Sequence, residues 1–266
     1  MYILFPNYIF CDRILKYLFI FLGKGREKLK RHIDPGIFIV LIAMFAFNLL
    51  DGRFSNPMDF LMNIIMLLPA IIIGISFHEF AHGFVSYKLG DPTPKLQGRL
   101  TINPVAHMDP FGFIALLFAG FGWGIPVQID PRYYKHRRRD EILVGLAGVT
   151  MNFVIAIVFA FIIKILISGG FSFMGGTFGQ VLVDILINIV FINIVLMVFN
   201  LLPVPPLDGF GILTNIFKLD TKSWYYKIYD KGFIILLILI VLGVTDKVIS
   251  PLISFIYSLI VNIIIF

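Results

Sequence analysis

The sequence is poor in the residues that cross-link or charge a soluble protein. Cys11 is its only cysteine in 266 residues, which excludes an intrachain disulfide and a thiolate metal cluster. Charged residues make up only 14% of the chain, against about 25% in soluble domains. There are five histidines, too few for the clustered histidine boxes of a membrane di-iron desaturase. A metal site in this chain must therefore use His, Asp, Glu or Asn.

Hydrophobic residues are abundant instead, at 59% of the chain, and the mean hydropathy is +0.93. They form long runs, and a transmembrane helix needs about 20 predominantly apolar residues. We therefore expect an all-α polytopic membrane protein with about six transmembrane helices. The expected spans are Pro35–Leu50, Phe60–Tyr87, Glu141–Ser168, Gln180–Leu202, Lys231–Val244 and Val248–Phe266.

Two shorter segments follow the second expected span. Phe111–Trp123 is apolar and rich in glycine but too short to cross, so we expect a re-entrant segment. Trp123–Asp130 has the composition of a short strand. We expect it to form a membrane-associated β-hairpin with Leu96–Ile102.

Basic residues lie in short loops between the apolar runs, and such loops stay on the cytoplasmic side. "GKGREKLKR" (Gly23–Arg31) and "RYYKHRRR" (Arg132–Arg139) are the strongest examples. The net charge of +6 is therefore no sign of a nucleic-acid partner. The first 21 residues have no uninterrupted apolar run of the kind found in a signal peptide, and we interpret them as an interfacial amphipathic helix or a poor span, within an interfacial or basic segment at 1–34.

The stretch "GISFHEFAHGFVSYKLGD" (Gly74–Asp91) places ionisable groups at the end of an apolar run, where they are costly and usually functional. His78 and His82 are four residues apart, so a helix presents both on one face, as two ligands of one zinc require. Glu79 beside them is suited to activate a zinc-bound water. The alternative is a pair of histidines hydrogen-bonded inside a bundle.

A catalytic zinc usually has three protein ligands, and Asp208 is the best candidate for the third. It lies in "NLLPVPPLDGFG", which follows the Gln180–Leu202 span on the same side of the membrane as His78. The prolines there break the helix, so the backbone can turn and direct a carboxylate into the bundle. An ordinary Asp-Gly turn at a helix start is the alternative.

In this order the motifs resemble the site-2 protease family of intramembrane zinc metalloproteases, in its compact form without PDZ or CBS domains. The matching pieces are "HEFAH" (His78–His82), "GRLTINPVAHMDPFG" (Gly98–Gly112), "GWGIPVQIDPRYY" (Gly122–Tyr134), "GLAGVTMNF" (Gly145–Phe153) and "NLLPVPPLDG" (Asn200–Gly209). The resemblance implies one catalytic Zn²⁺ with three ligands and a general base, namely His78, His82, Asp208 and Glu79. The chain departs from the family at Ile125, where a lysine is common, and at Phe210 and Gly211, where a basic residue is usual.

Asn152 lies in the middle of an apolar helix, where an amide must be hydrogen-bonded. In proteins that this chain resembles, an asparagine lies near the catalytic water, which implies a catalytic role as donor to the oxyanion. Joining helices through hydrogen bonds is the alternative. His107 either approaches the site or closes a turn, and we expect Asn200 to satisfy backbone groups freed by the prolines.

We therefore expect an intramembrane zinc metalloprotease that hydrolyses transmembrane or membrane-associated protein substrates. A single domain covers residues 1–266, with a catalytic core at 60–220 and C-terminal helices at 221–266. We expect a multi-pass protein of a prokaryotic plasma membrane, with its active site toward the cytoplasm. The alternatives are a membrane metal-ion transporter, which gains nothing from Glu79, and a catalytically inactive scaffold with the same metal site.

Overall fold

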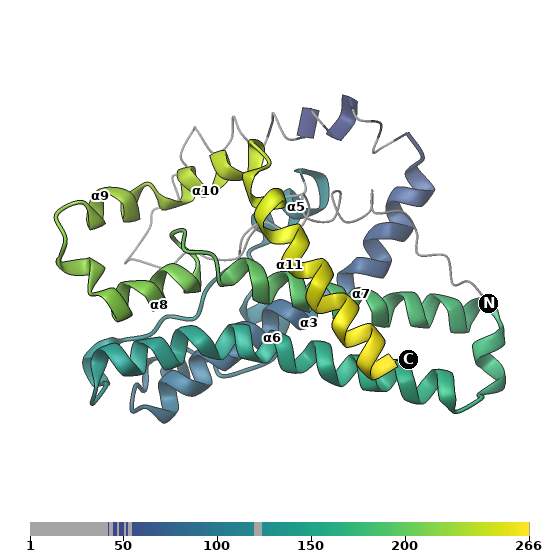
Figure 1. Ribbon diagram of the computed structural model, residues 1–266, viewed down its shortest axis with the longest axis horizontal. Coiled ribbons are helices and arrows are strands. Elements are labelled where there is room, and N and C mark those ends of the chain that lie inside the picture. The colour runs from purple at the N-terminus through teal and green to yellow at the C-terminus, as the bar shows by residue number, and fades with distance from the viewer. Residues whose placement is uncertain are drawn as a thin grey trace.

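The computed structural model describes residues 55–119 and 124–265, together with residues 42, 45, 46, 48–50 and 52. The segment 1–34 and most of the first expected span lie outside these residues. At the centre are three long helices, α3 (Pro57–Lys88), α6 (Arg137–Ser168) and α7 (Thr177–Asn200). They pack against one another, and α6 and α7 run side by side (Figure 1). Each of the three was predicted as a span.

Shorter elements connect and cover these helices. Between α3 and α6 the chain forms α4 (Thr93–Leu96), η1 (Pro104–Ala106), α5 (Pro110–Ala119) and η2 (Pro131–Tyr133). The turn η3 (Ser172–Gly175) joins α6 to α7. After α7 follow α8 (Asp208–Phe217), η4 (Leu219–Thr221), α9 (Tyr225–Asp230), α10 (Gly232–Val241), α11 (Val244–Ile260) and the π-helix η5 (Val261–Ile265). In Figure 1, α11 crosses over α7, and the two helices are in contact.

The described residues contain four helices that are long and apolar enough to cross a membrane, where the sequence predicted about six. They are Pro57–Lys88, Arg137–Ser168, Thr177–Asn200 and Lys247–Ile265. The span predicted at Lys231–Val244 is not confirmed, because α10 has ten residues and is about 15 Å long. The hydrocarbon core of a bilayer is about 30 Å thick. Gly243, with φ of 66°, turns the chain into α11 instead.

The predicted β-hairpin is not confirmed either. Within the described residues, the β-pairing is a single antiparallel bridge between Met108 and Gly124. Residues 125–130 run without helix or strand, and Leu96 ends α4 instead of pairing with them. Pro126 has no N–H to give to a ladder. The N–H groups of its neighbours Ile125 and Val127 donate to the His107 carbonyl oxygen and to the Glu79 carboxylate.

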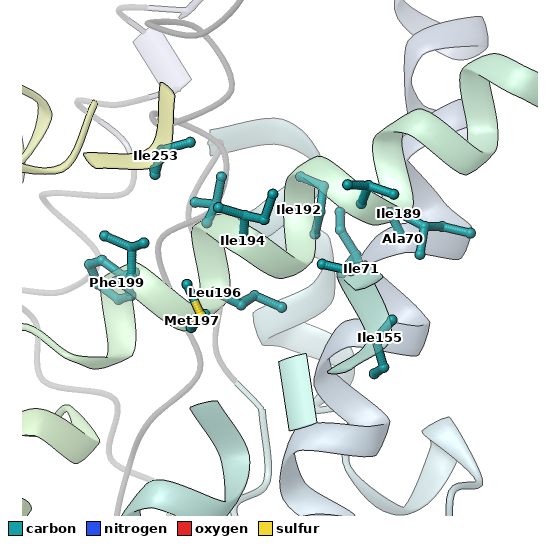
Figure 2. Close-up of a cluster of buried hydrophobic side chains, with 14 of the residues drawn as sticks. Ala70, Ile71, Ile155, Ile189, Ile192, Ile194, Leu196, Met197, Phe199 and Ile253 are labelled. Atoms are coloured by element: carbon teal, nitrogen blue, oxygen red, sulfur yellow. The ribbon is translucent and has the colours of Figure 1, made fainter. Parts of the chain in front are cut away.

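Close packing of small and branched side chains holds the three long helices together. Figure 2 shows Ala70 and Ile71 of α3 beside Ile155 of α6 and Ile189 of α7, and all four are buried. Lipid tails are as apolar as these side chains, so association depends on close contact more than on water exclusion. The fully buried Ile253 of α11 joins the same cluster.

Candidate metal centre

Three predicted ligands come together between α3 and α8. Among the described residues, His78, His82 and Asp208 are the group of His, Cys, Asp or Glu side chains close enough to share a metal ion. The two Nε2 atoms are 2.9 Å apart, and Asp208 Oδ2 lies 3.2 Å from that of His78 and 3.1 Å from that of His82. Ligand atoms held by one tetrahedral zinc at about 2.0–2.2 Å are roughly 3.3 Å apart. The spacing therefore fits a zinc site.

Local sequence explains how these side chains are placed. His78 and His82 are one turn apart on α3, with ring centroids separated by 4.6 Å. As the prolines predicted, α7 ends at Asn200, and α8 begins at Asp208 after an irregular loop. Gly209 lies against the loop backbone, where a Cβ would be 2.7 Å from the Leu202 carbonyl oxygen. The Asp-Gly pair thus allows the tight turn that brings the carboxylate under α3.

Hydrogen bonds on the far side of each imidazole set its tautomer. His78 Nδ1 is 2.6 Å from Asn152 Oδ1, and His82 Nδ1 is 2.7 Å from the Val144 carbonyl oxygen. Both oxygens can only accept, so each Nδ1 carries the proton and each Nε2 keeps its lone pair. Asp208 Oδ2, which is buried, has no hydrogen-bond donor among the described residues. Three electron-rich atoms therefore meet without a proton between them, as metal ligands do.

Gly148 of α6 provides the space beside these ligands. A Cβ at this position would overlap His82 Nε2 and would lie 2.7 Å from His78 Nε2. Gly148 lies three residues after Gly145 on α6. Its missing side chain is what lets α6 pass so close to both imidazoles.

Glu79 is buried beside the ligands, with 1% of its surface exposed. Its Oε2 accepts a hydrogen bond of 2.8 Å from the Val127 backbone N–H. Its Oε1 is buried and has no hydrogen-bond partner in the described part of the chain. One carboxylate oxygen is thus fixed by the segment 125–130, and the other has no donor among the described residues.

Asn152 is fully buried, and its amide oxygen and both amide N–H groups have hydrogen-bond partners. Its Oδ1 faces His78, and its Nδ2 donates to the Gly74 carbonyl at 3.0 Å and to Asn193 Oδ1 at 2.9 Å. Both N–H groups are therefore directed away from the ligand atoms. This arrangement holds the His78 ring and joins three helices.

His107 lies outside the metal group, in the turn after η1. It is fully buried, and its Nε2 is 2.8 Å from the Thr101 carbonyl oxygen. Its own carbonyl oxygen accepts from the Ile125 N–H at 2.8 Å. His107 therefore closes a loop and anchors the start of the segment that reaches Glu79.

The other end of that segment is anchored by Asp91, which sequence reasoning did not single out. Asp91 is fully buried and accepts from Ser86 Oγ at 2.8 Å and from the Asp130 N–H at 2.7 Å. Ser86 Oγ also lies 2.7 Å from the Tyr134 hydroxyl. Burial raises the pKa of Tyr134 to about 12, so this hydroxyl keeps its proton at neutral pH.

Asn193 is the other important residue that sequence reasoning missed. It is fully buried in α7 and donates to the Ile189 carbonyl oxygen at 2.8 Å. The signal was present, because an amide within an apolar run is the same pattern that drew attention to Asn152.

Comparison with known proteins agrees with this site. The model of peptidase family M50 matches residues 66–243. "Putative zinc metalloprotease YwhC" of Bacillus subtilis is 36% identical over 188 residues, which cover 71% of this chain and 85% of that protein. "Putative zinc metalloprotease Rip2" of Mycolicibacterium smegmatis is 25% identical over 231 residues, or 80% of this chain and 83% of that protein. No solved structure matches. Since the family model covers most of the chain and includes the three converging side chains, the chain belongs to peptidase family M50.

Proposed function

We propose that this intramembrane zinc metalloprotease uses His78, His82 and Asp208 as the ligands of one catalytic Zn²⁺ and Glu79 as its general base. The observation that carries the proposal is the meeting of three buried ligand atoms within 3.2 Å of one another. Two of them come from a helix long enough to cross a membrane. The substrates are transmembrane or membrane-associated proteins.

When bound, the zinc lowers the pKa of a water molecule and polarises the substrate carbonyl. Glu79 accepts the proton of that water at Oε1, the oxygen that no described group occupies, and then donates it to the leaving amine. The Val127 N–H holds Oε2 and so keeps the carboxylate from rotating. The buried position of the ligands keeps bulk water away.

Asn152 acts in this proposal by holding His78. Its Oδ1 fixes the ring, and both of its N–H groups are already donated to the Gly74 carbonyl and to Asn193. A role as donor to the oxyanion would require this amide to give up one of these bonds.

The substrate backbone is expected to dock on the segment 125–130. A helical substrate must unwind to expose its peptide bond, and its freed backbone groups then need partners. The Ile125 and Val127 N–H groups are used on one edge, by the His107 carbonyl oxygen and by Glu79. The backbone N–H and C=O groups of successive residues in an extended segment are directed to opposite edges. We infer that the substrate adds as a strand at the opposite edge, at the Pro126 carbonyl oxygen and the backbone groups of Gln128.

We place the active site toward the cytoplasm of a prokaryotic plasma membrane. His82 is six residues from Lys88 at the end of α3, or about 9 Å along the helix. The basic run Arg137–Arg139 begins α6, and Lys218 follows α8, which starts with Asp208. Basic loops of this kind remain on the inner side. The catalytic core at 60–220 and the C-terminal helices at 221–266 form parts of one domain in this proposal.

The test is cleavage of single-span membrane proteins by the purified chain in proteoliposomes, with the cut site mapped by mass. We expect cleavage within or beside the span, loss of cleavage with a chelator, and recovery on adding zinc. Bound zinc is measured in parallel for Asp208→Ala and His78→Ala, which should both lose it. Cleavage that persists in the chelator, or unchanged zinc in Asp208→Ala, would contradict the proposal.

A further inference from the structure

Asn193 lies in the second half of α7, a helix that contributes no ligand to the metal centre. It is fully buried between apolar neighbours such as Ile192 and Ile194, which are also fully buried. An amide in such a place is costly unless it is hydrogen-bonded. Asn193 uses its oxygen toward Asn152 and its nitrogen toward the carbonyl oxygen of Ile189. Its position therefore needs an explanation beyond packing.

The Ile189 carbonyl oxygen determines which group donates and which accepts in each of these hydrogen bonds. The Ile189 carbonyl oxygen can only accept, so Asn193 Nδ2 must face it at 2.8 Å. Asn193 then presents Oδ1 to Asn152, whose Nδ2 donates to it at 2.9 Å. The Gly74 carbonyl, 3.0 Å from the same Nδ2, takes the second N–H. The two acceptors leave Asn152 a single orientation, in which Oδ1 faces His78 Nδ1 at 2.6 Å.

We propose that Asn193 is a positioning residue that sets the tautomer of His78 through Asn152. With Oδ1 opposite Nδ1, the ring carries its proton on Nδ1 and offers the lone pair of Nε2 to the metal. A reversed Asn152 amide would place an N–H against Nδ1 and favour the proton on Nε2, which would block the ligand. The inference rests on the proposed ligation of zinc by His78.

Gly74 of α3 supports this role by making room for the amide. A Cβ at Gly74 would lie 2.6 Å from Leu196 Cδ1 and 3.3 Å from Asn193 Oδ1. The absence of a side chain thus lets α7 bring Asn193 against α3, while the Gly74 carbonyl accepts from Asn152. Three helices therefore contribute to one chain of hydrogen bonds that ends at a metal ligand.

The experiment measures the zinc dissociation constant of the purified chain by competition with a chelator, together with the melting temperature of the metal-free protein. We expect Asn152→Leu to weaken zinc binding about 100-fold and Asn193→Leu about tenfold, because outer hydrogen-bond partners of a ligand typically contribute 10–100-fold. The double variant should bind zinc no more weakly than Asn152→Leu alone, because Asn193 acts through Asn152. Asn193→Asp keeps an oxygen opposite Asn152 and should bind zinc more tightly than Asn193→Leu.

Asn188 provides the matched control on the same helix. Its Nδ2 is 3.5 Å from the Met66 carbonyl oxygen of α3, so Asn188→Leu also removes an α7–α3 contact but leaves Asn152 intact. We expect its zinc affinity to equal that of the wild type. If Asn193→Leu does not fold, Asn193→Ser removes the same bond without adding bulk and takes its place.

Two outcomes would overturn the inference. The first is wild-type zinc affinity in Asn193→Leu while His78→Ala loses zinc. The proposed ligation by His78 would then stand, but Asn193 would have no part in it. The other is a double variant in which the two losses of affinity multiply, since Asn193 would then act independently of Asn152. Unchanged zinc in His78→Ala would instead contradict the proposed function itself.

Discussion

The buried residues of the three long helices α3, α6 and α7 differ in polarity from one half of the helices to the other. Their site half is polar inside, and its buried residues include His78, Glu79, His82, Asn152 and Asn193. Their apolar half has a different set, which includes Ala70, Ile71, Ala156, Ile163 and Leu186. The same helices thus change character within two or three turns.

Dispersion contacts stabilise the apolar half, whereas hydrogen bonds stabilise the site half. Dispersion contacts in the apolar half depend on shape and have no polarity. Hydrogen bonds in the site half have a donor and an acceptor, so each fixes the orientation of the next, from the Ile189 carbonyl to His78. Substitutions in the site half should therefore alter chemistry more than stability, and those in the apolar half the reverse.

The largest effect is expected for Glu79→Gln in the site half. Gln keeps the size of Glu79 but cannot take a proton, so we expect turnover to fall by about 10³-fold or more. Bound zinc should stay near the wild-type level, because Glu79 is not among the three ligands. The measurement is the rate of cleavage with zinc content determined on the same sample. Undiminished turnover would remove Glu79 from the mechanism.

Gly148→Ala should give the next largest effect. The added Cβ would overlap His82 Nε2, so the imidazoles must move and we expect zinc binding to weaken by at least about tenfold. Gly145→Ala, one turn earlier on α6, is the control, because its Cβ meets the Ile212 side chain at 2.9 Å and no imidazole. Zinc dissociation constants of both variants decide the point. An equal loss in the two would show general disruption of the α6 packing.

The three candidate ligands of the site half were selected from the sequence, and their side chains lie close together in the structure. His78, Glu79 and His82 are placed by the period of a helix, which is local, so their spacing predicted one shared face. Asp208 came from topology and from the prolines after α7, and α7 does end at Asn200, before an irregular loop that leads to α8. Hydrogen-bond partners such as Asn193 and the Val127 N–H belong to other elements. Helix period does not reveal them.

The two features that were not confirmed concern segments without a strong period. The apolar run at Lys231–Val244 indicated a span, but Gly243 adopts positive φ and ends α10 early. Composition at Trp123–Asp130 suggested a strand, yet Pro126 lacks a donor and Glu79 and Asp91 take the N–H groups nearby. Local backbone conformation decided the first and tertiary contacts decided the second, and Trp123 itself lies outside the described residues.

Ile163→Ala tests the apolar half. Ile163 of α6 is 1% exposed, and its truncation should lower the free energy of unfolding by about 2 kcal/mol through the cavity left behind. Zinc affinity and turnover of the folded enzyme should remain close to the wild type. Unfolding in detergent, followed on the zinc-loaded and metal-free protein, measures the change. Loss of zinc at unchanged stability would show that the two halves are not separate.

The smallest effect is expected at Tyr134, which lies outside the spans and whose hydroxyl is 2.7 Å from Ser86 Oγ. Tyr134→Phe should cost about 1 kcal/mol of stability at neutral pH, and Tyr133→Phe, at a 53% exposed neighbour, should cost less. Burial raises the pKa of Tyr134 to about 12, whereas an unfolded tyrosine ionises near 10.

The ionised form is thus favoured by unfolding, so the stability that Tyr134 contributes is complete below about pH 10 and is lost as pH rises toward 12. Melting temperatures of the wild type should therefore fall over that range more steeply than those of Tyr134→Phe, which has no hydroxyl to ionise there. Parallel curves would mean that this hydroxyl is not held in a buried site. The hydrogen bond between Tyr134 and Ser86 would then differ in its burial from the hydrogen bonds around His78.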